Sequence, residues 1–148
     1  MKTIKHQIEI NLNQTDLFDL TQDYSRRLDW DSYLSEAYLL NGAKFADVGV
    51  DSFCKNKSGL VMISRYISFN RPSVAAVTMI KGSFILSRFS GAWNVKKIDE
   101  MNSILIFTYN FELKGGFLGR LILPIVAYFF SNDMKKRLSA IKNYVERK

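Results

Sequence analysis

The stretch FLGRLILPIVAYFF, residues 117–130, decides how the rest of the chain folds around it. It is apolar almost throughout, with one charge, Arg120, and one proline, Pro124. A membrane-spanning helix needs about 20 apolar residues, whereas this stretch reaches only about 21 Å at ~1.5 Å per residue. We therefore expect a helix that bends at Pro124, packs within the protein and does not cross a membrane.

The chain before this stretch is predicted to begin with a strand and two short helices. Residues 3–12 alternate between apolar and polar residues, as a half-buried strand does. Its apolar face carries Ile4, His6, Ile8, Ile10 and Leu12. Asn13 or Thr15 is the expected N-cap of a short helix. Residues 25–32, SRRLDWDS, are predicted to form a second short helix or turn.

Residues 34–114 are predicted to form six further strands joined by short turns. Connections this short favour antiparallel pairing. The last strand has an apolar face made of Leu105, Phe107, Tyr109, Phe111 and Leu113. Gly115-Gly116 ends the strands, and a long helix is expected after it, with a distal apolar stripe of Met134, Leu138, Ile141 and Val145. The length predicts a single domain, residues 1–148.

Composition narrows the range of functions. Aromatic residues make up 14% of the chain, which is enough to fill a core or to line a cleft for apolar molecules. The net charge is +7, but the basic residues are scattered except at Lys135, Lys136 and Arg137. No nucleic-acid-binding motif is present, and no nucleic-acid partner is expected. The basic cluster is predicted to be a solvated helix face, with contact to an anionic membrane surface as the alternative.

The single cysteine, Cys54, excludes an internal disulfide and a metal site built from paired cysteines. It lies in a strand-like alternation and is predicted to be a small buried thiol. Residues 1–10 lack the apolar segment of a secretory signal, so we expect a cytoplasmic protein. No phosphate-binding loop is present, and neither a metal nor a cofactor is expected.

The order of the predicted elements, together with RRLDWDS, FSGAWNV and SILIFTYNF, resembles the START-like polyketide cyclase and lipid-transport superfamily, SRPBCC. The resemblance covers essentially the whole chain. It implies an α+β helix-grip (START-like) fold, in which a seven-stranded antiparallel curved sheet wraps around a long C-terminal helix and two short helices follow the first strand. It also implies a deep apolar cavity between sheet and helix. Members bind lipids, sterols, hormones, quinones or polyketides, and some catalyse cyclisation or dehydration.

Polar residues on the predicted apolar faces are the candidates for chemistry in such a cavity. His6 is a candidate general acid or base, and Arg65 or Tyr109 a candidate holder of a carbonyl or oxyanion. The structural alternative is a hydrogen-bonded core histidine and an ion-paired arginine. The residues predicted to contact a ligand are Trp30, Arg65, Trp93, Phe107, Tyr109, Phe111, Leu121, Ile125 and Phe129. Placement in the plain core stays open for the tryptophans and for the three helix residues.

We therefore predict a protein that binds or transports a small hydrophobic ligand, such as a lipid, polyketide or quinone. The main alternative is a cyclase or dehydratase that needs no metal or nucleotide cofactor. A further alternative is a peripheral membrane protein that touches anionic lipid through its basic C-terminal helix. The same surface is also an alternative contact in a homodimer. Arg26 and Arg27 are expected to be a solvated pair near the cavity entrance, with attraction of an anionic head group as the alternative.

Overall fold

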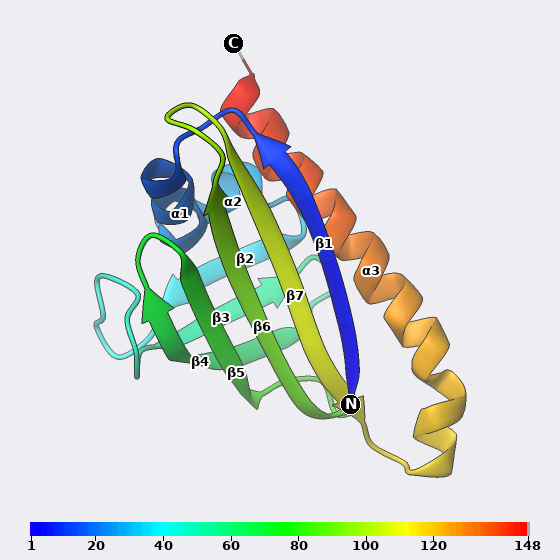
Figure 1. The fold of residues 1–148 in the computed structure, drawn as a ribbon. Helices are drawn as coiled ribbons and strands as arrows, with labels where there is room; N and C mark the ends of the chain where they lie inside the picture. The colour runs from blue at the N-terminus through cyan, green and yellow to red at the C-terminus, as the bar shows by residue number, and fades with distance from the viewer. Residues whose placement is uncertain (148) are drawn as a thin grey trace.

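The computed structural model describes residues 1–147, which form a curled sheet around a long helix (Figure 1). The seven strands are antiparallel and run in the order β1-β7-β6-β5-β4-β3-β2. They are β1 (Lys2–Ile10), β2 (Leu34–Leu39), β3 (Asp51–Asn56), β4 (Val61–Asn70), β5 (Val74–Lys81), β6 (Leu86–Lys97) and β7 (Ser103–Leu113). The helices are α1 (Gln14–Gln22), α2 (Arg27–Trp30) and α3 (Phe117–Glu146). The predicted α+β helix-grip architecture is confirmed.

The local signals at the ends of the helices act as the sequence predicts. The side chain of Asn13 accepts a hydrogen bond of 2.9 Å from the backbone N–H of Asp16, so Asn13 caps α1. Gly115 and Gly116 have φ angles of 95° and 51°, a region that residues with a side chain rarely adopt. These two glycines let the chain leave β7 and turn directly into α3.

The main core lies where the distal half of α3 crosses the first and last strands. Ile10 of β1 and Leu105 of β7 are fully buried, as are Met134 and Ile141 of α3. The alternation of β1 and β7 and the predicted distal stripe of the helix are therefore confirmed. Burial of each such side chain contributes about 1.5–3 kcal/mol to folding, so this contact anchors α3 to the sheet.

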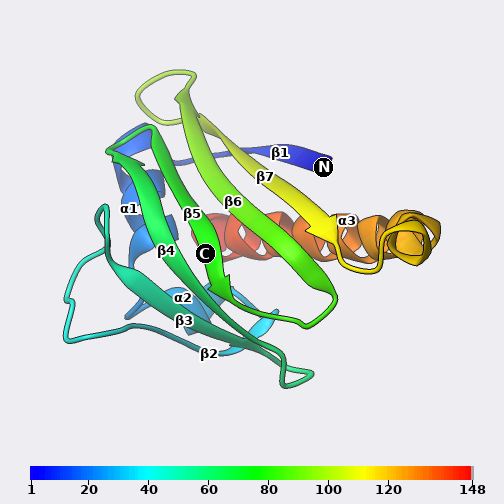
Figure 2. The ribbon, with the colours of Figure 1, turned by 90° about the horizontal axis from the view of Figure 1, so that it is seen from below.

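The first half of α3 projects beyond the sheet, as both ribbon views show (Figures 1 and 2). The helix is continuous through Pro124. The prediction that Leu121, Ile125 and Phe129 form a cavity wall is wrong, because their exposed fractions are 58%, 58% and 59%. The neighbouring Phe130 points inward instead. Within residues 1–147, no helix has both the length and the apolar character that crossing a membrane requires.

The structure also corrects the placement predicted for Arg65. Ser64 and Tyr66 of β4 are buried, whereas the side chain of Arg65 between them is 52% exposed. The Arg65 guanidinium donates two hydrogen bonds to Asp51, from Nε at 2.8 Å and from Nη2 at 3.1 Å. Arg65 therefore belongs to an exposed ion pair on the convex side of the sheet and does not face the cavity.

Candidate functional site

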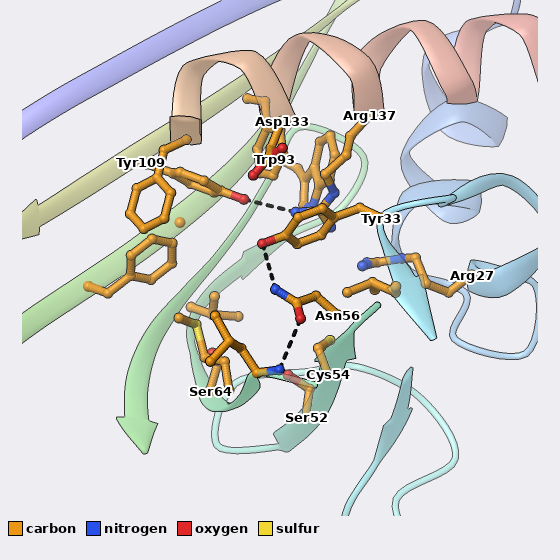
Figure 3. Close-up of a pocket in the computed structure, with 18 of the residues that line it drawn as sticks. Arg27, Tyr33, Ser52, Cys54, Asn56, Ser64, Trp93, Tyr109, Asp133 and Arg137 are labelled. Carbon is orange, nitrogen blue, oxygen red and sulfur yellow. Dashed lines mark hydrogen bonds between the residues drawn. The ribbon is translucent and has the colours of Figure 1, made fainter. Parts of the chain in front are cut away.

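A cavity of about 170 Å³ lies between the concave face of the sheet and the middle of α3 (Figure 3). Most of its wall is apolar and aromatic, and strands β3 to β7 supply most of the lining residues. Among the lining residues, Leu60 in the β3–β4 turn is exposed. The cavity therefore reaches solvent near that turn.

The aromatic residues predicted to contact a ligand divide into two groups. Trp93, Phe107 and Tyr109 line the cavity, and the Trp93 ring stacks on Phe107 with centroids 3.8 Å apart and an interplanar angle of 9°. Trp30 lies behind this pair, edge-on to Trp93 at 6.1 Å, and Phe111 packs against Phe130 at 4.9 Å. Trp30 and Phe111 are buried core residues outside the lining, which corrects their predicted placement.

Beside the aromatic wall, one carboxylate holds two buried arginines from different helices, and both arginines line the cavity. Asp31, which follows α2 and is 0% exposed, accepts hydrogen bonds from Arg137 Nη2 at 2.7 Å and Nε at 3.2 Å. Arg27 Nη1 lies 3.7 Å from the same carboxylate. Burial disfavours the charge on Arg137, but Asp31 and Tyr109 outweigh this effect and raise the pKa of Arg137. This ion-pair cluster ties α2 to α3.

Arg137 also orients Tyr109 at the cavity wall. Arg137 Nη1 donates a hydrogen bond of 2.8 Å to the Tyr109 hydroxyl oxygen. Within residues 1–147, the hydroxyl proton of Tyr109 has no acceptor. Burial raises the pKa of Tyr109 to about 12 despite the nearby guanidinium, so the phenol stays protonated at neutral pH. Tyr109 is therefore a hydrogen-bond donor directed at the cavity.

Tyr33 supplies a second donor of the same kind. The backbone N–H groups of Ser58 and Leu60 donate to Asn56 Oδ1 at 3.0 and 2.9 Å, which fixes the orientation of the Asn56 amide. Asn56 Nδ2 then donates a hydrogen bond of 3.1 Å to the Tyr33 hydroxyl oxygen, leaving the Tyr33 proton free. Figure 3 shows both phenol hydroxyls, those of Tyr33 and Tyr109, directed into the cavity.

Other polar groups around the cavity have contrasting environments. The hydroxyls of Tyr24 and Tyr66 lie 2.9 Å apart, and that of Tyr66 donates to Gln22 at 2.6 Å, so these phenols satisfy each other. Burial raises the pKa of Cys54, which lines the cavity as a protonated thiol. Asp133 of α3 also lines the cavity and has no hydrogen-bond or ion-pair partner within residues 1–147. Burial raises the pKa of this carboxyl, although Lys136 and Arg137 oppose the effect.

His6 lies away from the cavity, between β1 and α3. Its Nε2 atom is 2.6 Å from the hydroxyl oxygen of Ser131, and the residue is not part of the lining. Burial and the neighbouring Lys135 lower the pKa of His6. This environment matches the structural alternative, in which a neutral histidine bonds strand to helix. No group of three His, Cys, Asp or Glu side chains within residues 1–147 could hold a metal ion.

Sequence reasoning missed Asp31, Tyr33 and Asp133. The predictions that Arg27 and Arg137 are solvated are wrong, because both side chains are buried. Arg137 lies three residues after Met134 and four before Ile141. That spacing places it on the apolar side of the helix. Arg27 and Asp31 are four residues apart, as an ion pair on one helical turn would be. These spacings indicate burial of Arg27, Asp31 and Arg137, whereas nothing in the sequence indicates that Tyr33 lines the cavity.

A long helix gripped by a curled antiparallel sheet, with an aromatic cavity between them, defines the helix-grip class of ligand-binding folds. The profile of the polyketide cyclase / dehydrase and lipid transport family matches residues 1–146. The chain belongs to this family. A search of curated proteins finds no match to the sequence.

Solved structures with the same fold cover nearly the whole chain. A START superfamily protein from Mycobacterium smegmatis has a TM-score of 0.81 at 11% identity, covering 98% of this chain and 97% of the other. The aromatase/cyclase Zhui from a Streptomyces species has a TM-score of 0.80 at 16% identity, with coverage of 99% and 94%. Norcoclaurine synthase from Thalictrum flavum has a TM-score of 0.75 at 14% identity, also with coverage of 99% and 94%. At these identities, the likeness establishes the shared fold.

Proposed function

We propose that this protein binds a small, largely aromatic molecule with at least one carbonyl, enolate or phenolic oxygen in the cavity between the sheet and α3. One observation carries the proposal. Tyr33 and Tyr109 each accept a hydrogen bond from a protein donor and direct a free hydroxyl proton into a mostly apolar cavity. An apolar ligand gains from leaving water, and an oxygen acceptor on it satisfies donors that would otherwise stay unpaired.

The contribution of the phenol donors can be tested with a pair of probes of similar shape. We expect Tyr33→Phe to weaken binding of 1-naphthaldehyde about threefold to tenfold, as loss of one net hydrogen bond predicts. The same substitution should leave binding of 1-methylnaphthalene unchanged. Isothermal titration calorimetry or fluorescence titration measures both affinities.

The control is Tyr38→Phe, because Tyr38 lies on β2 outside the cavity lining and is exposed. Equal effects on the aldehyde and the hydrocarbon would contradict the proposed role of the hydroxyl.

A second candidate function is a cyclase or dehydratase, favoured by the environment of Asp133. An unpaired carboxylate with a raised pKa suits a general base. In this reaction, Asp133 takes a proton from the carbon beside a ligand carbonyl; the electrons of the broken C–H bond form the C=C bond of an enolate, and the π electrons of the carbonyl move to its oxygen. Tyr33 and Tyr109 would stabilise the resulting enolate by donating hydrogen bonds. Cyclisation and dehydration of polyketides both proceed through such enolates.

Asp133→Asn separates catalysis from binding. With 2-tetralone as a test ketone in deuterated water, we expect the wild-type protein to accelerate deuterium uptake beside the carbonyl. The variant should lose about 10²-fold or more of that acceleration and still bind the ketone. Asp29→Asn, at an exposed position, is the control. If both proteins leave the uncatalysed rate unchanged, the carrier function stands alone.

The same variant carries a prediction about stability. Because the pKa of Asp133 is raised in the folded protein, ionisation of this carboxyl destabilises the fold above its ordinary pKa of 3.8. Asp133→Asn should therefore raise the melting temperature at pH 7, and the difference should shrink as the pH falls toward that value. Melting curves across this range would measure it.

The basic cluster Lys135, Lys136 and Arg137, predicted to be a solvated helix face with membrane contact as the alternative, is not a continuous exposed surface. Lys135 and Lys136 are exposed, but Arg137 is buried in the ion pair with Asp31. These three residues alone therefore give little support to membrane or dimer contact through the distal half of α3.

A further inference from the structure

The first half of α3 carries an exposed apolar surface that the cavity does not explain. We define the α3 stripe as six large side chains whose exposed fractions lie between 58% and 73%: Phe117, Leu118, Leu121, Ile125, Tyr128 and Phe129. At ~100° per residue they lie on one side of the helix, opposite the residues that pack on the sheet, and they extend over about 18 Å. With about 200 Å² as the full surface of such a side chain, the stripe exposes on the order of 700 Å². Patches of this size mark interaction surfaces.

Basic residues continue the α3 stripe along the same side of the helix. Lys135 and Lys136 follow Tyr128 and Phe129 by seven residues, two helical turns, and both lysines are exposed. Arg120 is exposed beside the stripe. An apolar helical surface with adjacent lysines and arginine is the pattern of a helix that lies in the interface of an anionic bilayer.

The end of the sheet where α3 begins has the same character. Its loops carry exposed apolar side chains, Phe84 in the β5–β6 connection and Leu60 in the β3–β4 turn. The backbone N–H of Lys114 donates to the carbonyl of Ile85 at 2.8 Å, which holds the β5–β6 connection beside the start of α3. The exposed basic residues at this end are Lys2, Lys57, Lys81 and Lys114.

The charges of the molecule are distributed unevenly between its two ends. Glu112 lies at the end where α3 begins, opposite Arg88 in the β6–β7 register. Acidic residues gather at the other end, on or just after α1 and in the β6–β7 turn: Asp16, Asp19, Asp23, Asp99 and Glu100. Of these, Asp19 pairs with Arg71 and Glu100 with Lys97. The apolar surface is therefore bordered by positive charge. A second copy docked on the same surface would bring like charges together, whereas lipid phosphates would neutralise them.

We propose that the α3 stripe, together with Phe84 and Leu60 at the same end of the molecule, docks this protein on an anionic membrane surface. The stripe inserts among the lipid head groups, and the neighbouring lysines and arginine contact lipid phosphates. The cavity opens at this same end near Leu60, so a docked protein holds its cavity mouth toward the bilayer. That last consequence rests on the proposed ligand-binding function, but docking itself does not.

Vesicle flotation tests the proposal with the ligand-free protein. We expect wild-type protein to float with vesicles of phosphatidylcholine and phosphatidylglycerol, and much less with phosphatidylcholine alone or in high salt. The triple variant Leu121→Ser, Ile125→Ser, Phe129→Ser should lose at least tenfold in partition coefficient. Its control replaces exposed apolar residues elsewhere: Phe45→Ser, Val48→Ser and Ile67→Ser. All six substituted positions in the two variants are exposed, so both variants should fold.

The charge contribution has its own variant. The double variant Lys135→Glu, Lys136→Glu should weaken binding to anionic vesicles, by at least roughly fivefold for each lysine replaced. Lys44→Glu with Lys96→Glu, at exposed positions away from the stripe, should have a smaller effect. Absence of wild-type binding to anionic vesicles overturns the proposal. A wild-type dimer in light scattering that the triple serine variant converts to monomer also overturns it, because the occupant would then be a second copy.

The outcomes distinguish docking from ligand binding. Ser64→Phe, which fills the cavity, should float with anionic vesicles as the wild-type protein does. If vesicle binding fails while 1-naphthaldehyde still binds, only the docking proposal falls. If the aldehyde does not bind but the vesicles do, only the cavity proposal falls.

Discussion

Asp31→Ala should lower the free energy of unfolding by about 3–5 kcal/mol, the effect of removing one partner from a buried ion pair. Asp31 is fully buried and accepts hydrogen bonds from Arg137. Without this carboxylate, the charges of Arg137 and Arg27 remain buried near each other, and Arg27 Nε already lacks an acceptor within residues 1–147. Chemical denaturation monitored by tryptophan fluorescence measures the loss.

The matched control for this substitution is Asp29→Ala, two residues earlier on α2. Asp29 is exposed, so its removal should change stability by less than about 0.5 kcal/mol. A loss below about 1 kcal/mol for Asp31→Ala would contradict the view that this carboxylate holds α2 to α3. The double variant Asp31→Ala, Arg137→Met should recover part of the loss, because it removes one of the two stranded charges.

Ser64→Phe should weaken ligand binding at least tenfold, which corresponds to a loss of about 1.4 kcal/mol or more in binding free energy. Ser64 lies on the inner side of β4 and lines the cavity. A phenyl ring at this position occupies space that a ligand would otherwise fill. Because the cavity offers that space, the ring should be accommodated with a stability cost within the range of about 1–3 kcal/mol for overpacking.

The control for the cavity-filling variant is Ile67→Phe on the opposite face of the same strand. Ile67 is exposed, so an aromatic ring there leaves the cavity unchanged. Titration of 1-naphthaldehyde should give the wild-type affinity for Ile67→Phe and no saturable binding for Ser64→Phe. Wild-type binding by a folded Ser64→Phe protein would place the ligand elsewhere.

The sequence predicted those features of the fold that depend on local pattern. The alternation along β1 and β7 identified their inner faces, because these two strands pair with each other without a register shift. Short turns predicted the antiparallel meander. Gly115-Gly116 predicted the start of α3, and both glycines have the positive φ angles that such a turn requires. In each case the information lies within a few residues of the element concerned.

The inner face of β4 could not be predicted in this way, because its register is irregular. The pairing of β4 with β5 shifts between Tyr66 and Ser68, so residues before and after the shift follow different alternations. Phe69 faces inward against Phe18 at 5.4 Å, and counting back from it in steps of two selects Arg65 wrongly. A bulge reverses which side chains point inward, and no residue in this segment signals one.

The site itself depends on contacts between segments far apart in the sequence. Asp31 and Arg137 are 106 residues apart, and Tyr109 and Arg137 are 28 apart. The orientation of α3 also escaped prediction, because residues 117–130 are apolar on every side and so carry no periodic signal. The cavity therefore receives Phe130 in place of Leu121, Ile125 and Phe129. Aromatic residues on regular strands, Trp93, Phe107 and Tyr109, were placed at the cavity correctly, while their role in binding stays a prediction.

The most direct test of ligand binding in the cavity is an NMR titration of backbone amides with 1-naphthaldehyde. We predict saturable shift changes centred on lining residues from three strands, Ser64, Gly91 and Tyr109, with no saturable change at these sites in Ser64→Phe. Shift changes that grow without saturation, or that centre on the exposed residues 117–129 of α3, would contradict the account.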